Sequence, residues 1–311
     1  MSAAGPQVGI LILNYHAPDT TLACVRSLLA VEGEGTRILW LENDADATLA
    51  EVLPVLEASG LPWARLDPAT GALPAPGQIG FLPSPSNLGY GAGNNVGLRF
   101  LHRHGVPFAW VLNNDTLLTR GGSADLVRAA EARPQVGLWG MTIAAEAGPS
   151  YVGCRVQAHD FATAHLERVQ DLEADPMAYV SGCAMFFRTA QGVAAGGIPE
   201  EYFLYYEDVA FSWAMRGLGL ALGAVPEVEV LHAESLSTGR RSRLVEFYNR
   251  RNRWRFIQTF FPAFLARQEF RFFTYQLQKL AFRLRFGRIR LEWQAWRDFR
   301  AGRFGRTRRT F

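Results

Sequence analysis

Short apolar segments alternate with helical patterns through the first 135 residues. The runs Val8–Asn14, 37–43 and Phe108–Asn113 are apolar and short enough for buried parallel strands, and 78–82 is a shorter candidate that we expect Pro83 to end. Helical patterns fill the intervals, at residues 18–29, 49–56, 90–104 and 124–133. The alternation predicts an α/β fold with an open, mostly parallel sheet and helices on both faces.

Polar side chains close three of these strands. Ligands of open α/β sheets bind at the carboxyl ends of the strands, so these residues are the first candidates for a site. They are Asn14-Tyr15, Glu42-Asn43-Asp44 and Asn113-Asn114-Asp115. The chain has 311 residues, 49% of them hydrophobic, which suits one large α/β domain with an appendage.

The segment Asn113-Asn114-Asp115 is the strongest single feature. A nucleoside diphosphate needs a divalent cation to neutralise its phosphates, and hard cations prefer oxygen ligands. Asp115 could bind such a cation and leave positions free for phosphate oxygens. The alternative is an ordinary Asn/Asp cluster at the turn after a strand.

A glycine-rich segment runs from Asn87 through Gly89 to Asn94 and Asn95. It has the glycines of a phosphate-binding loop, but it follows a short strand, whereas a dinucleotide-binding loop would directly follow Asn14. The alternative interpretation is a flexible loop that caps a helix.

Two further candidates lie in the second half. Glu207 and Asp208 begin a helix, where one carboxylate could accept a proton from an attacking hydroxyl and the other would raise its pKa. Acidic residues at a helix start can also simply be favourable N-terminal charges. His232 ends an apolar strand and is either a structural residue or a contact to a phosphate or a metal.

The end of the chain has a different composition. Residues 240–311 hold 20 of the 32 Lys and Arg residues and only 4 of the 29 Asp and Glu residues, interleaved with Phe, Trp and Tyr. We expect two or three amphipathic helices, broken near Pro262 and Gly287. Such a segment could bind an anionic membrane surface or a nucleic acid. The alternative is a helical subdomain or a homo-oligomer contact with a solvated basic face.

The cysteines and the hydropathy bound the compartment. Cys24, Cys154 and Cys183 are scattered and show no metal-binding spacing, which disfavours a disulfide framework or a zinc site and favours a reducing cytoplasm. No uninterrupted apolar run reaches 18 residues, and residues 1–7 lack the pattern of a signal peptide.

Taken together and in this order, the motifs resemble glycosyltransferase family 2, in particular its rhamnosyltransferase-like branch. The resemblance covers about residues 8–240. It rests on Asn14-Tyr15, Glu42-Asn43, the segment from Asn87 to Asn95, Leu112 to Thr116, Ser181 to Met185, Gly196-Gly197, Phe203 to Asp208, and His232 with Ser237.

The resemblance implies a GT-A fold with a catalytic domain at 1–240, divided into a nucleotide-binding half at 1–135 and an acceptor half at 136–240, and an extension at 241–311. It implies roles for single residues. Asn14, Tyr15, Glu42, Asn43, Asn87, Gly89, Asn94, Asn113 and Asn114 would bind the nucleotide, Gly182 would line the sugar pocket, Asp115 would bind Mg²⁺ or Mn²⁺, His232 would approach the metal or the diphosphate, and Asp208 would be the catalytic base with Glu207 beside it.

Three positions depart from the family pattern. Asn113 stands where an Asp is usual in the metal-binding motif, which lowers the negative charge of the predicted site. Glu42 replaces the more usual Asp, and Ala210 replaces an acid often found after the Glu-Asp pair.

The implied function is an inverting glycosyltransferase of bacterial polysaccharide biosynthesis. It would transfer a sugar from a nucleoside-diphosphate donor, with dTDP-rhamnose favoured and UDP-hexoses next, to a glycan or a lipid-linked glycan, at the inner face of the cell membrane. A nucleic-acid-binding protein would explain the basic end but not the ordered motifs. A nucleotidyltransferase is disfavoured because residues 9–19 carry no Lys or Arg.

Overall fold

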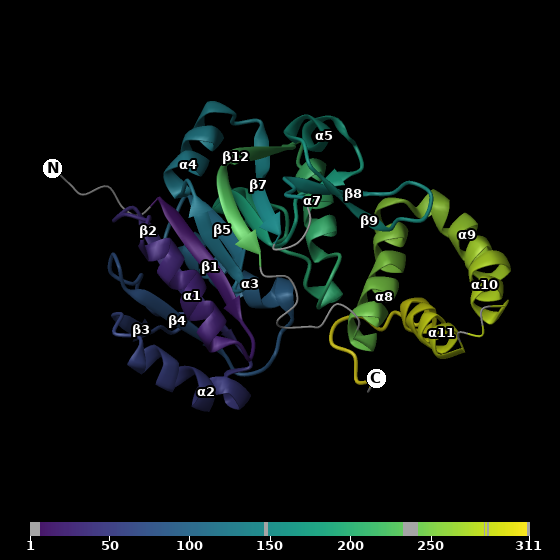
Figure 1. The fold of residues 1–311 in the computed structure, drawn as a ribbon, viewed down its shortest axis with the longest axis horizontal. Coiled ribbons are helices and arrows are strands. Elements are labelled where there is room, and N and C mark those ends of the chain that lie inside the picture. Colours follow the sequence, from purple (N-terminus) through teal and green to yellow (C-terminus); the bar gives the residue numbers. More distant parts are fainter. Residues whose placement is uncertain (1–6, 146–148, 233–241, 283, 285, 310–311) are drawn as a thin grey trace.

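A central sheet of nine strands forms the core of the computed structural model, which describes residues 7–145, 149–232, 242–282, 284 and 286–309 (Figure 1). The strand order is β3-β4-β2-β1-β5-β11-β7-β12-β6. The strands are β1 (Val8–Asn14), β2 (Thr36–Asn43), β3 (Trp63–Arg65), β4 (Ile79–Ser84), β5 (Phe108–Asn113), β6 (Thr116–Arg120), β7 (Val136–Ala145), β11 (Ala184–Arg188) and β12 (Ala221–His232). Five neighbouring pairs are parallel, while β11 and β6 run antiparallel to their neighbours. The predicted mostly parallel α/β sheet is confirmed.

Helices cover both faces because side chains alternate along each strand. Ile10 and Ile12 of β1 belong to the core under α1 (Pro18–Leu29), α2 (Ala45–Ala58) and α4 (Ser123–Ala132). Leu11 belongs to the opposite core, under α3 (Tyr90–Arg103) and α7 (Glu207–Gly217). The remaining helices of this part are α5 (Val169–Ala174), α6 (Thr189–Ala194) and the short η1 (Glu200–Tyr202).

The glycines of the Asn87 segment lie mostly within α3, and their small size lets the helix pack directly on β1. A Cβ on Gly97 would come within 2.6 Å of a Leu11 methyl carbon, and one on Gly93 would come equally close to Leu13. Gly93 thus has a packing role within the segment, and Gly97, which follows the segment, has the same role. They are needed for close packing between helix and sheet.

Two other expectations fail at the edge of the sheet. β4 continues through Pro83 to Ser84, because a parallel partner on one side needs only some of the backbone N–H groups; Pro83 stands opposite Glu42. The three-residue β3 lies beyond it and was not expected, since so short a segment has no readable periodicity.

A second, three-stranded sheet lies in the acceptor half. Its order is β10-β8-β9, from β8 (Gly153–Val156), β9 (Thr163–Leu166) and β10 (Ala178–Tyr179). Figure 1 shows β8 and β9 between the central sheet and the C-terminal helices. The three cysteines are buried free thiols.

The C-terminal extension is helical, as expected. Its elements are α8 (Arg243–Phe260), α9 (Pro262–Arg271), the π-helical η2 (Phe272–Gln276), α10 (Leu277–Phe282) and α11 (Phe286–Arg300). The break at Pro262 is confirmed, and the second break falls just before Phe286. Trp254, Phe256 and Phe299 belong to the same core cluster as β1 and α1, so the extension shares the core of the main domain. Among the described residues, no helix combines the length and apolarity that a bilayer crossing needs.

Candidate functional site

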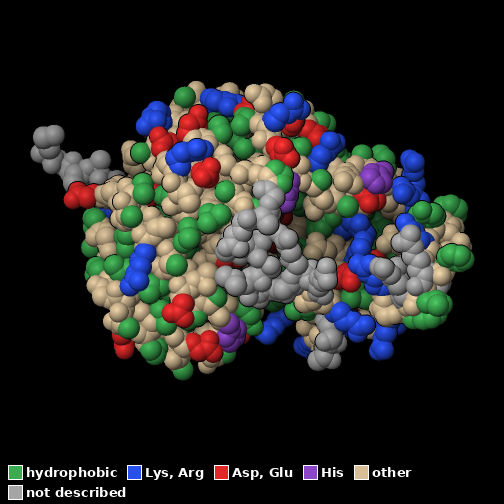
Figure 2. All heavy atoms as spheres, viewed as in Figure 1, with side chains coloured by type: hydrophobic (Ala, Val, Ile, Leu, Met, Phe, Trp, Pro, Cys, Tyr) green, Lys and Arg blue, Asp and Glu red, His purple; other side chains and the backbone are tan. Residues whose placement is uncertain are grey.

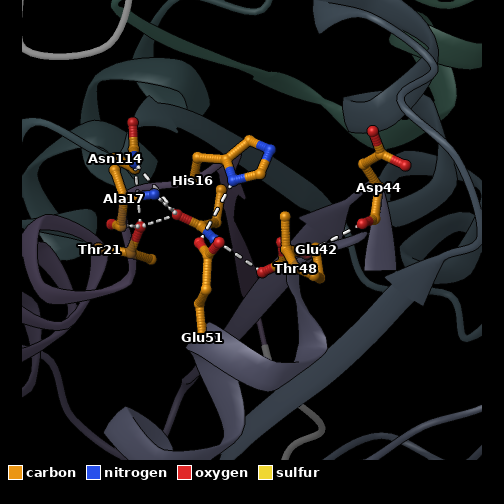
Figure 3. A network of polar contacts seen from close by, with 9 residues as sticks. His16, Ala17, Thr21, Glu42, Asp44, Thr48, Glu51 and Asn114 are labelled. Carbon is orange, nitrogen blue, oxygen red and sulfur yellow. Dashed lines mark hydrogen bonds and ion pairs between the residues drawn. The ribbon is translucent and has the colours of Figure 1, made fainter. Parts of the chain in front are cut away.

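A buried hydrogen-bond network joins the ends of β1 and β2. One carboxylate oxygen of Glu42 accepts hydrogen bonds from the Asn14 amide, at 2.7 Å, and from the Trp40 indole, at 3.0 Å. The other oxygen accepts one from Thr48 at 2.6 Å (Figure 3). Burial raises the pKa of Glu42, and these hydrogen bonds oppose the rise.

The same network reaches the end of β5. Thr21 donates to the Asn14 amide oxygen at 2.8 Å, and the Asn114 amide donates to Thr21 at 3.0 Å (Figure 3). Asn14 and Glu42 have no exposed surface, and in this conformation their side chains hold the ends of β1 and β2 together from within the core. The expected contact of these two residues with a nucleotide stays a prediction, and here both side chains are used within the network. Tyr15, the next residue after Asn14, is 37% exposed to solvent.

The Asn87 segment is tied to the end of β2 by side-chain amides. Asn43 accepts a hydrogen bond from the Leu88 amide at 2.8 Å and donates to the Asn87 side chain at 3.2 Å. Asn87 in turn accepts from the Gly89 amide at 2.9 Å. Asn94 is buried one turn into α3 and donates to the Tyr90 carbonyl at 3.0 Å. These residues fix the path of the loop, and the loop leads to the second half of the site.

Replacing Gly89 with alanine should lower the free energy of unfolding by roughly 2–4 kcal/mol. Gly89 has φ +85° and ψ 179°, a region that only glycine adopts readily, and a Cβ there would lie 2.4 Å from the Phe203 carbonyl oxygen. Urea unfolding measures the change. Gly105→Ala is the matched control, because Gly105 also has positive φ but has open space around its Cβ position. Equal losses in both variants would contradict the close approach at Phe203.

Asp115 and His232 lie against each other at the edge of the sheet. His232 ends β12, which pairs with β6 directly after Asp115, and the His232 Nε2 atom lies 3.2 Å from the Asp115 Oδ1 atom. Both side chains are largely buried. Neither Asp115 Oδ1 nor His232 Nδ1 has a hydrogen-bond partner within the described parts of the chain.

Asp115 and His232 fit a divalent cation. Neighbouring ligand atoms in a six-coordinate shell with bonds near 2.1 Å lie roughly 3 Å apart, close to the spacing seen here. Among the described residues no third His, Cys, Asp or Glu joins them, so further ligands would be water, amide or carbonyl oxygens, or a bound phosphate. Asn113, where the predicted metal-binding motif lacks a carboxylate, is half-buried and lies two residues before Asp115.

The Glu207–Asp208 pair begins α7, as predicted. Asp208 accepts hydrogen bonds from the Gly182 amide at 2.9 Å and the Val209 amide at 2.8 Å, one on each carboxylate oxygen. Burial nevertheless raises the pKa of Asp208. Glu207 is buried, and its Oε2 atom has no hydrogen-bond partner among the described residues. Burial and the neighbouring Asp208 raise the pKa of Glu207 well above its ordinary value.

Residues 182 and 183 link the two carboxylate sites. At the end of β5, the backbone amide of Asn113 donates to the Cys183 carbonyl at 2.9 Å. The backbone amide of Gly182, the residue before Cys183, donates to Asp208. Burial raises the pKa of the Cys183 thiol, and the charges of Asp115 and Asp208 both add to the rise. Through Gly182 and Cys183, Asp208 is thus connected to the end of β5 at Asn113, two residues before Asp115.

Tyr90 joins the nucleotide-binding half to this arrangement. Its hydroxyl donates to the Gly182 carbonyl, and its backbone amide donates to the Phe203 carbonyl at 2.7 Å. Burial raises its pKa well above the ordinary value, and Glu207 and Asp208 raise it further. Contacts of Tyr90, Gly182 and Cys183 thus connect α3, Asp208 and the end of β5; Ser237 lies outside the described residues.

The loop before Glu207 holds an unusual backbone. Phe203, Tyr205 and Tyr206 all have positive φ, at 65°, 68° and 72°. Such conformations cost about 1–2 kcal/mol for each non-glycine residue, so other contacts must hold them.

Asn252 of α8 provides those contacts. Its side-chain amide donates to the carbonyls of Tyr202, Leu204 and Tyr205, each at 2.8 Å. Arg251 donates to the Tyr202 carbonyl at 3.1 Å. Both side chains are almost fully buried. The sequence gives one weak signal of this role, a pair of polar residues inside an amphipathic helix, and it does not reveal the partner.

Comparison with known proteins gives relatives by sequence and by fold. No protein-family model matches the chain. It is 28% identical over 188 residues to the N-acetylglucosaminyl-diphospho-decaprenol L-rhamnosyltransferase of Mycobacterium tuberculosis, in strains CDC 1551 / Oshkosh and H37Rv. The alignment covers 52% of this chain, and the chain spans 61% of the length of those curated relatives.

Among solved structures, the mannosyltransferase PcManGT of Pyrobaculum calidifontis, in complex with GDP-Man and Mn²⁺, has a TM-score of 0.53 at 14% identity over 96% of this chain and 76% of that one. TarS of S. aureus has a TM-score of 0.50 at 12% identity over 86% of this chain and 44% of that one. The predicted fold and the predicted resemblance to rhamnosyltransferases are both confirmed.

Proposed function

We propose that this chain is an inverting glycosyltransferase. It transfers a sugar from a nucleoside-diphosphate donor, with dTDP-rhamnose favoured and UDP-hexoses next, to a hydroxyl of a glycan or a lipid-linked glycan. The relationship to a rhamnosyltransferase named for a diphospho-decaprenol substrate supports the donor and the acceptor class.

The observation that carries this proposal is the meeting of two unlike acidic sites at one sheet edge. Asp115 with His232 is suited to a metal-bound diphosphate, and Glu207 with Asp208 is suited to proton transfer. Displacement of a sugar from a diphosphate needs both groups on opposite sides of the anomeric carbon. The Gly182 amide bonds Asp208 and the carbonyl of the next residue, Cys183, accepts from the Asn113 backbone amide, so adjacent residues connect the two sites.

Asp208 acts as the general base. Its carboxylate, held by the Gly182 and Val209 amides, accepts the proton of the acceptor hydroxyl as the oxygen attacks the anomeric carbon. Its raised pKa makes it a stronger base than an ordinary carboxylate. Glu207 holds a proton over a wider pH range and can hydrogen-bond the acceptor. A single displacement from the face opposite the diphosphate inverts the anomeric configuration.

Asp115 and His232 would hold Mg²⁺ or Mn²⁺. When bound, the cation neutralises charge that develops on the leaving diphosphate. With only one carboxylate in the pair and Asn113 beside it, we expect these residues to hold the cation firmly only together with a nucleotide diphosphate.

The nucleotide and the metal should therefore stabilise the protein together. Nucleotide sugar with Mn²⁺ should raise the melting temperature by several degrees, since a ligand at 100 times its Kd adds about 2.7 kcal/mol. Either component alone should give a smaller shift. Asp115→Asn should remove the increment that depends on the metal, and Asp171→Asn, on the exposed side of α5, is the control. A screen in which no nucleotide sugar raises the melting temperature of the wild type would contradict the proposed function.

We also propose that the extension places the enzyme on an anionic membrane at its cytoplasmic face. Phe270, Tyr275, Phe282 and Phe286 are all more than 60% exposed on α9 to α11, among arginines. Exposed aromatic side chains between basic residues suit the interface of an anionic bilayer. The described extension offers no comparable reason to favour nucleic acid.

A further inference from the structure

A groove lined by arginines lies where the extension meets the second sheet. It consists of two adjoining hollows of about 530 and 540 Å³, which share Arg250, Arg253 and Arg288 as lining residues. Arg271 and Lys279 line the first hollow as well. In Figure 2, blue side chains gather at this junction, beside the C-terminal helices.

The groove has more positive charge than its carboxylates neutralise. Arg250 pairs with Glu292 at 3.1 Å, and Arg288 pairs with Glu246 at 2.8 Å. The third lining carboxylate, Asp160, lies 3.6 Å from His159. Five lining cations therefore face three carboxylates, each of which has its own partner.

Arg253 is the least satisfied of these cations. It is half-buried, lines both hollows, and has no hydrogen bond or ion pair with any described residue. Arg271 donates only to the His159 carbonyl, at 2.5 Å, and Lys279 lies over the Tyr275 ring. Burial and the nearby charges of Arg253 and Arg288 lower the pKa of Arg250, while Glu292 and Glu246 oppose the shift.

The groove adjoins the catalytic pair. Tyr206, which directly precedes Glu207, lines the second hollow. Burial raises its pKa to about 12, Arg253 and Arg250 oppose that rise, and Asp208 adds to it. The ring therefore lies within electrostatic reach of both the arginines and the proposed base. Of the exposed aromatics of the extension, Tyr275 lines the first hollow, and Phe270, Phe282 and Phe286 are exposed on α9, α10 and α11.

We propose that this groove binds the diphosphate of a lipid-linked acceptor, with Arg253 as the residue that makes the principal contact. The inference rests on the proposed function, which provides an acceptor whose sugar hydroxyl must reach Asp208. Arginine forks bind phosphate oxygens in bidentate fashion, and a diphosphate provides the negative charge that Arg253, Arg271 and Lys279 lack. The lipid chain of the bound acceptor then extends from the groove along the exposed aromatic side chains.

The test uses geranyl diphosphate as the probe, with geraniol for comparison, on the full chain with saturating nucleotide diphosphate and Mn²⁺ to fill the donor site. Binding is measured by calorimetry. The wild type should bind geranyl diphosphate and not geraniol. Arg253→Glu should weaken binding at least tenfold, and Arg253→Gln should weaken it less while avoiding an unpaired buried carboxylate.

Arg267→Glu is the control, because Arg267 is an exposed residue of α9 that does not line the groove. It should bind the probe nearly as the wild type does. The thermal shift with nucleotide sugar should be unchanged in all three variants, so a failure of the donor site and a failure of the groove remain distinguishable. Equal affinity in wild type and Arg253→Glu would overturn the proposal.

A second arm separates the two sources of phosphate. Vesicles of phosphatidylcholine with and without phosphatidylglycerol are sedimented with the wild type and with Arg253→Gln. The proposal expects similar vesicle binding by the two proteins, since Arg253 is half-buried in the groove. Vesicle binding that depends on Arg253, together with no affinity of the wild type for geranyl diphosphate, would assign the groove to bilayer headgroups and reject the acceptor subsite.

Discussion

Asp208→Asn should reduce sugar transfer by a factor of about 10²–10⁴, the usual contribution of a general base. The amide cannot take the hydroxyl proton. It also cannot accept both the Gly182 and the Val209 hydrogen bonds, since one of its two polar atoms is a donor. The loss should appear in kcat, measured by product formation, while the thermal shift with nucleotide sugar and Mn²⁺ stays close to that of the wild type.

The pH dependence provides the check on this assignment. The base works only when deprotonated, and burial raises the pKa of Asp208, so wild-type activity should fall as the pH decreases at a higher pH than for an ordinary carboxylate. Glu207 and Asp208 titrate as a pair, so the profile reports both groups. Glu207→Gln keeps Asp208 and mimics the protonated Glu207, so activity should fall at nearly the same pH as in the wild type. Near-normal turnover by Asp208→Asn would remove Asp208 from the mechanism.

The second large effect is expected at Asn252, far from the site in sequence. Asn252→Asp keeps the size of the side chain but replaces the donor with a carboxylate that faces three carbonyls. We expect a loss of stability on the order of 2–3 kcal/mol, because three carbonyls lose their donor and face a carboxylate. Arg251 donates to the Asn252 side-chain oxygen at 3.0 Å and would offset part of the cost of the buried charge. Urea unfolding measures it.

Catalysis should fall in the same variant even where it stays folded. The strained residues Phe203, Tyr205 and Tyr206 lead directly into Glu207, so relaxing them displaces the pair. kcat should decrease at least tenfold at a temperature well below unfolding, with donor binding retained. Gln258→Glu makes the same chemical change at an exposed position of α8 and should leave both properties unchanged. A stable Asn252→Asp enzyme with normal kcat would show that the loop holds its own shape.

Much of the fold is predictable because its signals are local. β1 and β5 have the predicted bounds, since an apolar run that ends in polar residues marks a buried strand from both sides. β3 and the extension of β4 through Pro83 depend on neighbours in the sheet and leave no local signal. The packing role of Gly93 and Gly97 in α3 leaves no local signal either, since their partners Leu13 and Leu11 lie about 80 residues away.

The site follows the same division. The sequence points to Asp115, His232 and the Glu207–Asp208 pair because their motifs, taken together and in order, resemble those of glycosyltransferase family 2. Each motif alone is equally typical of an ordinary turn, strand end or helix start. It does not reveal that Asn14 and Glu42 face inward, since their partners Thr21 and Thr48 are ordinary helix residues. Tyr90 is equally silent, because an aromatic residue in a glycine-rich segment has many uses.

Helix α8 carries two different duties within four consecutive residues. Arg250 and Arg253 line the basic groove, while Arg251 and Asn252 between them clasp the backbone that precedes Glu207. Because α8 is a continuous helix, a shift that repositions Arg250 and Arg253 for a different acceptor also moves Asn252, and with it the backbone that precedes Glu207. A change of acceptor preference would therefore require substitution of Arg250 or Arg253 with Arg251 and Asn252 retained. Under the proposed function, removing the extension should abolish sugar transfer as well as membrane binding.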